Sequence, residues 1–245
     1  MKQGFLEQES KRGNKRVWKK LFIELLIIIC LVAFIGFAVK DTIDFSDEKT
    51  RKLLPYIYIV IGMIVLSVVF QIFHSIMILV NGKNLTLPFK ENTKAAVGEI
   101  IDREVAEGKV LVEEYIYEFS EEEKPKGERV ILLPSYLLIC NGMGHVMAIP
   151  RDKIYWICAQ TGIKGRSSFM VRLLIFTEKR TFYLNGVDIP QMGKIADKLY
   201  QYIPNVFSEY ASFPLYYELE ELFEKNRGAF LKLYEEKKKE LLEKG

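Results

Sequence analysis

Histidine and cysteine are scarce in this 245-residue chain, which has two histidines and three cysteines. His74 and His145 stand near no cluster of Cys, Asp or Glu with the spacing of metal ligands. Cys30, Cys140 and Cys158 form no CxxC pair, and their odd number argues against a disulfide framework. We therefore predict no metal site, no disulfide and no cofactor.

The sequence also lacks the motifs of common catalytic folds. No nucleophile-elbow pattern surrounds Ser135, Ser167 or Ser168, and the two histidines leave little choice of a base. Strands and helices do not alternate as a Rossmann or P-loop domain requires, and no internal repeat is evident. The net charge of +3 is too small to indicate a nucleic acid partner. We predict that the chain is not an enzyme and does not bind nucleic acid.

Two long apolar runs near the N-terminus dominate what the sequence does contain. They cover residues 21–39 and 53–80. Each is long enough to cross a bilayer core of about 30 Å at about 1.5 Å rise per residue. The sequence therefore predicts two transmembrane helices, joined by an external loop over 40–52.

Basic residues gather before the first run and set the predicted orientation. Residues 1–20 form a predicted basic cytoplasmic arm on the membrane surface, whose positive charges include Lys11, Arg12, Lys15, Arg16, Lys19 and Lys20. Because short loops rich in Lys and Arg stay in the cytoplasm, both termini are predicted there. The predicted location is the cell membrane (an inner or plasma membrane), with the protein integral to it.

The next part of the chain, 85–210, has the local signals of a β domain with a leading helix. Asn92 or Thr93 is a suitable N-cap for a helix over Lys94–Glu107. A closing helix from about Asp188 to Tyr202 has apolar residues at spacings of three and four. Between them we predict about six short antiparallel strands, within Val110–Val112, Tyr115–Phe119, Arg129–Cys140, His145–Ile149, Lys153–Gln160, Phe169–Thr177 and Thr181–Leu184.

This succession resembles the pleckstrin-homology-like (PH-like) domains of uncharacterised two-pass bacterial membrane proteins. The stretches that carry the resemblance are VILLPSYLLICNGMGHVMAIPRDKIYWICAQ, VRLLIFTEKRTFYL and IADKLYQYIPNVF, and the resemblance covers roughly residues 109–205. Pro150–Ile154 matches a P-R-D-K-I type segment of such proteins. The resemblance implies a binding module without fixed catalytic residues.

One loop has the composition of a ligand site. Gly162 and Gly165 allow close backbone approach, and the cations and hydroxyls beside them suit an anionic ligand such as a lipid headgroup. These candidate site residues are Lys164, Arg166, Ser167 and Ser168. The alternative is an ordinary solvated loop between strands.

Residues 211–245 form a predicted helical tail. Its apolar residues recur at three and four, and Glu221 with Lys225 forms an i,i+4 pair. The tail either packs on its own domain or meets a partner.

The predicted fold class is thus membrane α+β: a transmembrane hairpin, a PH-like β domain and an amphipathic tail. The predicted function is a non-catalytic integral membrane protein that presents the PH-like module to a protein partner or to a second copy of itself, with the lipid bilayer as a further partner. The alternative is a subunit of an oligomeric small transporter or channel, for which Glu24, Ser67, Gln71, His74 and Ser75 are the available polar residues.

Overall fold

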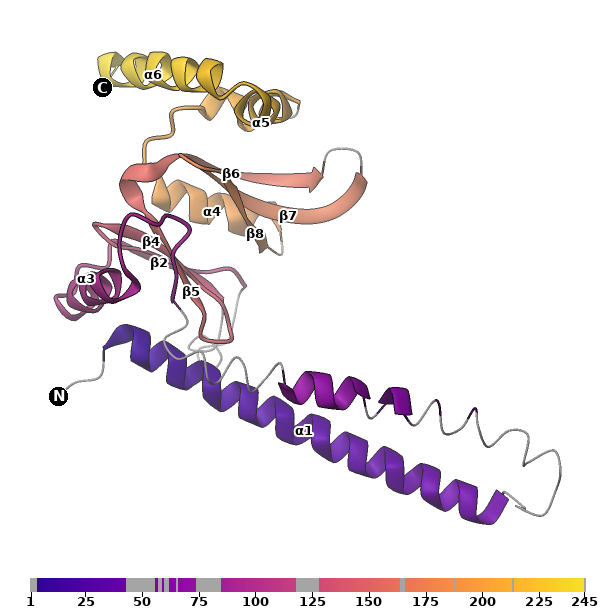
Figure 1. The fold of residues 1–245 in the computed structure, drawn as a ribbon. Coiled ribbons are helices and arrows are strands. Elements are labelled where there is room, and N and C mark those ends of the chain that lie inside the picture. Colours follow the sequence, from indigo (N-terminus) through magenta and orange to yellow (C-terminus); the bar gives the residue numbers. More distant parts are fainter. Residues whose placement is uncertain are drawn as a thin grey trace.

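A β unit of two sheets lies between an N-terminal helix and a C-terminal helix pair (Figure 1). In this computed structural model the described residues are 4–42, 56, 59, 62–64, 66–73, 85–117, 128–163, 166–186, 188–212 and 214–244. Side chains are described within these ranges except at 16, 20, 31–42, 162–170 and 244.

Helix α3 (Lys94–Ala106) confirms the predicted leading helix of the β domain. Thr93 caps it, because its side-chain oxygen accepts a hydrogen bond from the Ala96 N–H at 3.3 Å. The chain leaves the helix through Gly108, whose φ of 71° favours glycine. The buried face of α3 includes Val97 and Ile101, and it packs on the first sheet.

The first sheet is mixed and has the order β1-β5-β4-β3-β2. Its strands are β1 (Leu85–Thr86), β2 (Val112–Tyr115), β3 (Arg129–Leu132), β4 (Tyr136–Cys140) and β5 (Val146–Pro150). Strands β2 to β5 form an antiparallel meander, and β1 adds to β5 in parallel. Both faces are apolar: alternate residues of β3 and β4 face either the central core or the layer beneath α3.

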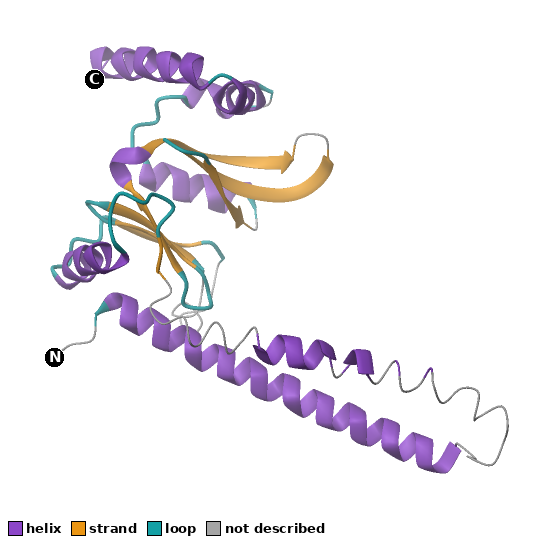
Figure 2. Ribbon diagram, in the orientation of Figure 1, coloured by secondary structure: helices purple, strands orange, loops and turns teal. Residues whose placement is uncertain are grey.

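The second sheet has the order β6-β7-β8 and is antiparallel. Its strands are β6 (Ile154–Ile163), β7 (Arg166–Thr177) and β8 (Thr181–Gly186). Helix α4 (Ile189–Leu199), capped by Asp188, closes the core between the two sheets (Figure 2). Strands β6 and β7 pair through Ile163 and Arg166, so most of the segment 161–168 is strand and not the predicted loop.

The C-terminal tail packs on its own domain. Helices α5 (Leu215–Lys225) and α6 (Arg227–Lys244) cover the outer face of the second sheet, where Phe223 and Phe230 are buried against Trp156 and Phe176. Asn226 separates the two helices. The sequence left open whether the tail packs on its own domain or meets a partner. The part of the tail from Leu219 to Tyr234 packs on its own domain.

Helix α1 (Phe5–Thr42) includes most of the segment predicted as a basic arm. Its first turns dock on the β unit: the Leu6 N–H donates to Asp102 Oδ1 at 3.0 Å, and Leu6, Glu9 and Val17 are buried. Gly13 lies against the backbone of the β4–β5 turn, so closely that a Cβ atom there would be 2.2 Å from the Met143 carbonyl oxygen. This end of the helix is therefore part of the domain and not a free arm.

Among the described residues, no helix has an apolar stretch long enough to reach across a bilayer. Where side chains of α1 are described, the apolar stretch is Leu21–Cys30, ten residues that contain Glu24 and span about 15 Å. The second run is described only in part, as helical residues at 56, 59, 62–64 and 66–73, of which Val68, Gln71 and Ile72 share a small hollow with α1. The loop 43–52 and His74 lie outside the described residues.

This finding contradicts the predicted transmembrane helices at 21–39 and 53–80. The two-pass hairpin, the integral membrane protein, its location in the cell membrane and the transporter or channel alternative are wrong on the same ground. The fold that the structure describes is an N-terminal helix followed by an α+β unit with one mixed and one antiparallel sheet.

Candidate binding cleft

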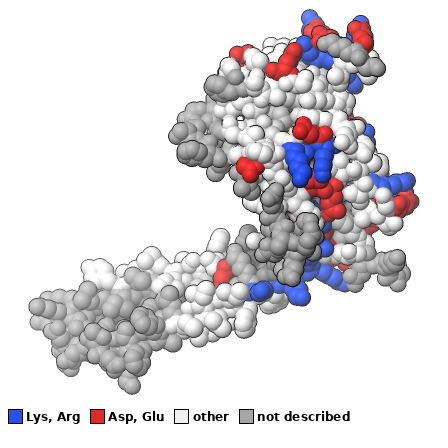
Figure 3. All heavy atoms as spheres, turned by 180° about the vertical axis from the view of Figure 1, so that it is seen from behind, with Lys and Arg blue, Asp and Glu red and all other residues white. Residues whose placement is uncertain are grey.

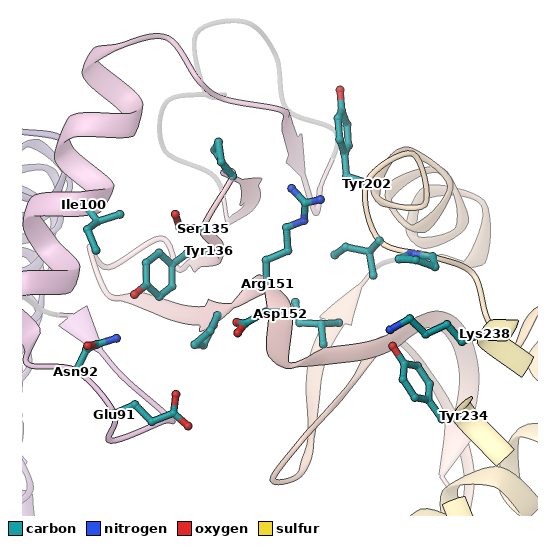
Figure 4. A pocket seen from close by; sticks show the side chains of 15 residues that line it. Glu91, Asn92, Ile100, Ser135, Tyr136, Arg151, Asp152, Tyr202, Tyr234 and Lys238 are labelled. Carbon is teal, nitrogen blue, oxygen red and sulfur yellow. The ribbon is translucent and has the colours of Figure 1, made fainter. Parts of the chain in front are cut away.

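An open cleft of about 760 Å³ lies at the corner where the chain passes from the first sheet to the second (Figure 4). Residues from α3, the β3–β4 turn, the corner after β5, the end of α4 and the face of α6 line it. They are Glu91, Asn92, Ile100, Pro134, Ser135, Tyr136, Pro150, Arg151, Asp152, Ile154, Tyr202, Ile203, Pro204, Tyr234 and Lys238.

Hydrogen bonds to the buried residue Glu104 brace the wall of this cleft on the side of the first sheet. Glu104 of α3 is buried and accepts hydrogen bonds from the Ser135 hydroxyl at 2.5 Å and the Ser135 N–H at 3.3 Å. The Ser135 carbonyl accepts from the Arg151 N–H at 3.0 Å. The β3–β4 turn is thereby tied both to α3 and to the short 3₁₀ turn at Arg151–Lys153.

The charged groups of the cleft are mixed in sign. Arg151 and Asp152 stand on the corner, Glu91 on the opposite wall and Lys238 on α6, where its Nζ lies 5.6 Å from the centre of the Tyr234 ring (Figure 4). Behind the corner, a hydrogen bond to Glu178 raises the pKa of Lys153, whose Nζ is 2.6 Å from that carboxylate. A cleft with both signs of charge suits a polar ligand that itself carries both.

Tyrosines supply much of the remaining surface. Burial raises the pKa of Tyr136, while a hydrogen bond with Asn92 opposes the shift. Burial also raises the pKa of Tyr234, on the other side of the cleft. These phenols therefore stay un-ionised at neutral pH, and they offer hydrogen bonds and ring surface without charge.

The buried cysteines Cys140 and Cys158 and the histidine His145 do not line the cleft. Burial raises the pKa of the Cys140 thiol to about 12 and raises that of Cys158 further, so neither is a thiolate at neutral pH. His145, in the β4–β5 turn, is half-buried, and burial lowers its pKa. Among the described residues no three His, Cys, Asp or Glu side chains gather as metal ligands.

The structure separates the site residues that the sequence singled out. Lys164 lies outside the described residues, and Arg166, Ser167 and Ser168 begin strand β7, with side chains that are not described. Within the basic segment, Lys11 pairs with Glu7 and Arg12 with Glu9, each at 2.9 Å. Lys15 and Lys19 are exposed on α1, and Arg16 and Lys20 have no described side chain.

Sequence reasoning did not predict the cleft. Arg151 and Asp152 were noted only as members of the P-R-D-K-I type segment that carries the resemblance, and not as site residues. Glu91, Tyr136 and Lys238 come from distant parts of the chain, and only the fold brings them together. Comparison with protein-family models, curated proteins and solved structures finds no match to this chain.

Proposed function

We propose that this chain is a non-catalytic binding protein, in which a PH-like β unit holds an extended segment of a protein partner in the cleft at the sheet corner. The observation that carries the proposal is the lining of that cleft. Tyrosines, prolines and charges of both signs surround a volume of about 760 Å³. Tyrosine and arginine are enriched where proteins bind one another.

The strand order supports the PH-like part of the proposal. The antiparallel meander β2–β5 is followed by the antiparallel meander β6–β8 and then by helix α4, which closes the core. The resemblance drawn from the sequence implies this succession of hairpins closed by one helix. Helix α3, strand β1 and helices α5 and α6 are additions, and α3 and α6 contribute to the cleft.

Site-specific crosslinking in cells that naturally produce the protein tests the proposal. A photo-crosslinking residue in place of Asn92, in the cleft, should capture one partner protein. The same residue in place of Lys194, which is exposed on α4, should not. Charge reversal by Arg151→Glu should weaken the capture from position 92 while leaving thermal stability unchanged. Capture of the chain itself would identify a second copy as the occupant, and equal capture from both positions would refute the proposal.

A lipid bilayer is a second candidate partner, and the surface of α1 favours it. From Trp18 onward large apolar side chains are exposed, and at about 100° per residue they span an arc of about 200° around the helix. They are Trp18, Phe22, Ile23, Leu25, Leu26, Ile27 and Ile29. This arc is wider than the stripe of about 100° with which a helix packs on a globular surface. The remaining side carries Leu21, Glu24 and Ile28, which share a small hollow with Val68 and Gln71. On the face seen in Figure 3, the described atoms of the projecting part are mostly uncharged, and Lys and Arg side chains gather at its base.

Flotation with vesicles tests this second candidate. The full-length chain should float with phosphatidylcholine vesicles and more strongly when they contain phosphatidylglycerol, because Lys15 and Lys19 are exposed beside Trp18. Phe22→Ser, at a side chain that is 67% exposed, should reduce flotation. Leu242→Ser, at a 74% exposed position on α6, is the matched control. Equal flotation of the two variants would refute contact through α1.

A further inference from the structure

A second hollow, of about 540 Å³, lies where the β7–β8 turn meets the junction of α5 and α6. We call it the basic hollow. It is lined by Lys179, Arg180, Thr181, Tyr183, Phe223, Glu224 and Arg227. It shares no residue with the cleft, and it lies at the opposite end of β7 from the predicted ligand loop at 164–168.

The cations of the basic hollow have no carboxylate partner among the described residues. No Asp or Glu oxygen lies within 4.0 Å of the charged nitrogens of Lys179, Arg180 or Arg227 in this part of the chain. Lys153 and Lys237 differ in this respect, since each contacts two carboxylates. The three charges thus line one hollow, and none of them forms a direct ion pair with a described carboxylate.

The guanidinium of Arg227 is held in a partly dehydrated position. It donates hydrogen bonds to the carbonyls of Phe223 and Thr177, each at 3.3 Å, and to that of Glu178. Burial lowers the pKa of Arg227, which remains a cation at neutral pH. A cation with neutral carbonyl partners retains its full charge for an anion that enters the hollow.

Aromatic rings position the three cations. The Arg227 guanidinium carbon lies 3.6 Å from the centre of the Phe223 ring, and that of Arg180 lies 4.5 Å from the centre of the Phe182 ring. Lys179 Nζ lies 5.0 Å from the Phe89 ring centre. Less side-chain entropy is lost on binding when donors are placed in this way. Beside them the Thr181 hydroxyl is buried without a hydrogen-bond partner among the described residues.

Acidic groups offset only part of this charge, and one of them is Glu178, whose charge acts to raise the pKa of Arg227 against the effect of burial. Glu224 lines the hollow as its one carboxylate, against three cations. Glu220 is nearby, and its Oε1 accepts a hydrogen bond from the Tyr183 hydroxyl at 2.8 Å. The lining side chains alone thus carry a charge of +2, from three cations and one carboxylate.

We propose that the basic hollow binds a phosphate ester. The Arg180 guanidinium presents forked N–H donors that match phosphate oxygens, and Arg227 and Lys179 add two neighbouring positive charges. The volume exceeds that of a single inorganic ion, so the bound group is the phosphate of a larger molecule. That molecule is either a free phosphorylated metabolite or the headgroup of a phospholipid, since both present the same chemistry.

Titration of the full-length chain with pyrophosphate, at ionic strength held constant with chloride, tests the site itself. Binding should weaken about tenfold in Arg180→Gln, because one charge-assisted contact is lost. Lys194→Gln removes an exposed cation from α4 and should leave binding unchanged. Among the described residues the Arg180 guanidinium forms no hydrogen bond or ion pair and only the ring contact with Phe182, so the melting temperature of Arg180→Gln should stay within a few degrees of the parent.

Vesicles separate the two sources of the phosphate. Flotation that needs phosphatidic acid in a phosphatidylcholine vesicle and is lost in Arg180→Gln assigns the hollow to a headgroup. Pyrophosphate binding without such flotation assigns it to a free phosphate ester. The proposal is overturned when neither probe binds, or when Lys194→Gln weakens binding as much as Arg180→Gln. The basic hollow shares no lining residue with the cleft, so Arg180→Gln should leave the crosslink from position 92 intact, and the two proposals can fail separately.

Discussion

Replacing Glu9 with Gln should destabilise the junction between α1 and the β unit. Glu9 Oε1 accepts hydrogen bonds from a terminal nitrogen of Arg129 at 2.8 Å and from Arg12 at 2.9 Å. The side chains of Glu9 and Arg129 are 4% and 5% exposed. Without the Glu9 carboxylate, Arg129 stays buried with Glu113 as its remaining acidic partner, at 2.9 Å.

The size of the effect follows from the burial of the pair. Opposite charges about 4 Å apart attract by about 4 kcal/mol at an effective dielectric constant of about 20. Removal of one member of a buried pair costs about 3–5 kcal/mol, because the other charge stays desolvated. Glu113 is 42% exposed and compensates in part. We therefore expect Glu9→Gln to lower the free energy of unfolding by about 2–3 kcal/mol.

Urea unfolding of the full-length chain, followed by circular dichroism, measures this loss. Glu7→Gln is the control, since Glu7 forms an exposed i,i+4 pair with Lys11 and its loss should cost about 0.5 kcal/mol or less. Hydrogen exchange should accelerate at the amides of 5–17 in Glu9→Gln alone. Equal stability losses in the two variants would refute the role assigned to the buried pair.

Three further substitutions or measurements probe other parts of the fold. Gly144→Ala should lower the free energy of unfolding by about 2 kcal/mol or more, because the φ of Gly144 is 80° and a Cβ atom there would lie 2.6 Å from the Glu9 carbonyl oxygen. Gly108→Ala is the control: the φ of Gly108 is 71° but a Cβ atom would meet open space, so the loss should be only about 1 kcal/mol. Phe230→Ala removes a fully buried ring, so about 3–5 kcal/mol of stability should be lost and limited proteolysis should cut within 215–244 first. A maleimide at pH 7 should label Cys30, which is exposed, before Cys140, whose pKa burial raises to about 12, and denaturation should remove the difference.

Local signals in the sequence predicted the elements of the β unit well. The Thr93 cap, the Asp188 cap and the Asn141 turn each depend on residues within four positions, so the sequence displays them directly. The helix α3 and most strand positions are therefore confirmed.

Contacts between distant residues were not predictable in the same way. Glu9 and Arg129 are 120 positions apart, and nothing in either neighbourhood marks them as partners. Strand β1 has two residues and exists only because β5 offers it a free edge. Gly162 and Gly165 favoured a loop, yet cross-strand pairing extends β6 to Ile163. The cleft likewise needs the folded chain, since its walls come from residues 91 to 238.

The prediction of two transmembrane helices had a different weakness, because it relied on the length of apolar runs alone. Within the described side chains of α1, the buried position Val17 is followed at once by Trp18, which is 61% exposed. One helix thus combines a docked segment, whose contacts include a buried ion pair, with an exposed apolar segment. Hydropathy averaged along the chain does not reveal the docked segment. In the sequence, Glu9 and Arg12 look like ordinary surface charges, although Glu9 is buried against Arg129.

The docked segment fixes the direction of α1 relative to the cleft, and this has a testable consequence. If a partner or a lipid surface contacts Phe22 to Ile29, the docked first turns of α1 hold that contact at a set distance from Arg151 in the cleft. A ligand that binds both the helix and the cleft then meets the second surface at a raised effective concentration. Glu9→Gln should then weaken the crosslink from position 92, although Glu9 does not line the cleft. Glu7→Gln should leave the crosslink intact. An undiminished crosslink in Glu9→Gln, with α1 shown by hydrogen exchange to be undocked, would mean that the cleft and the helix bind independently.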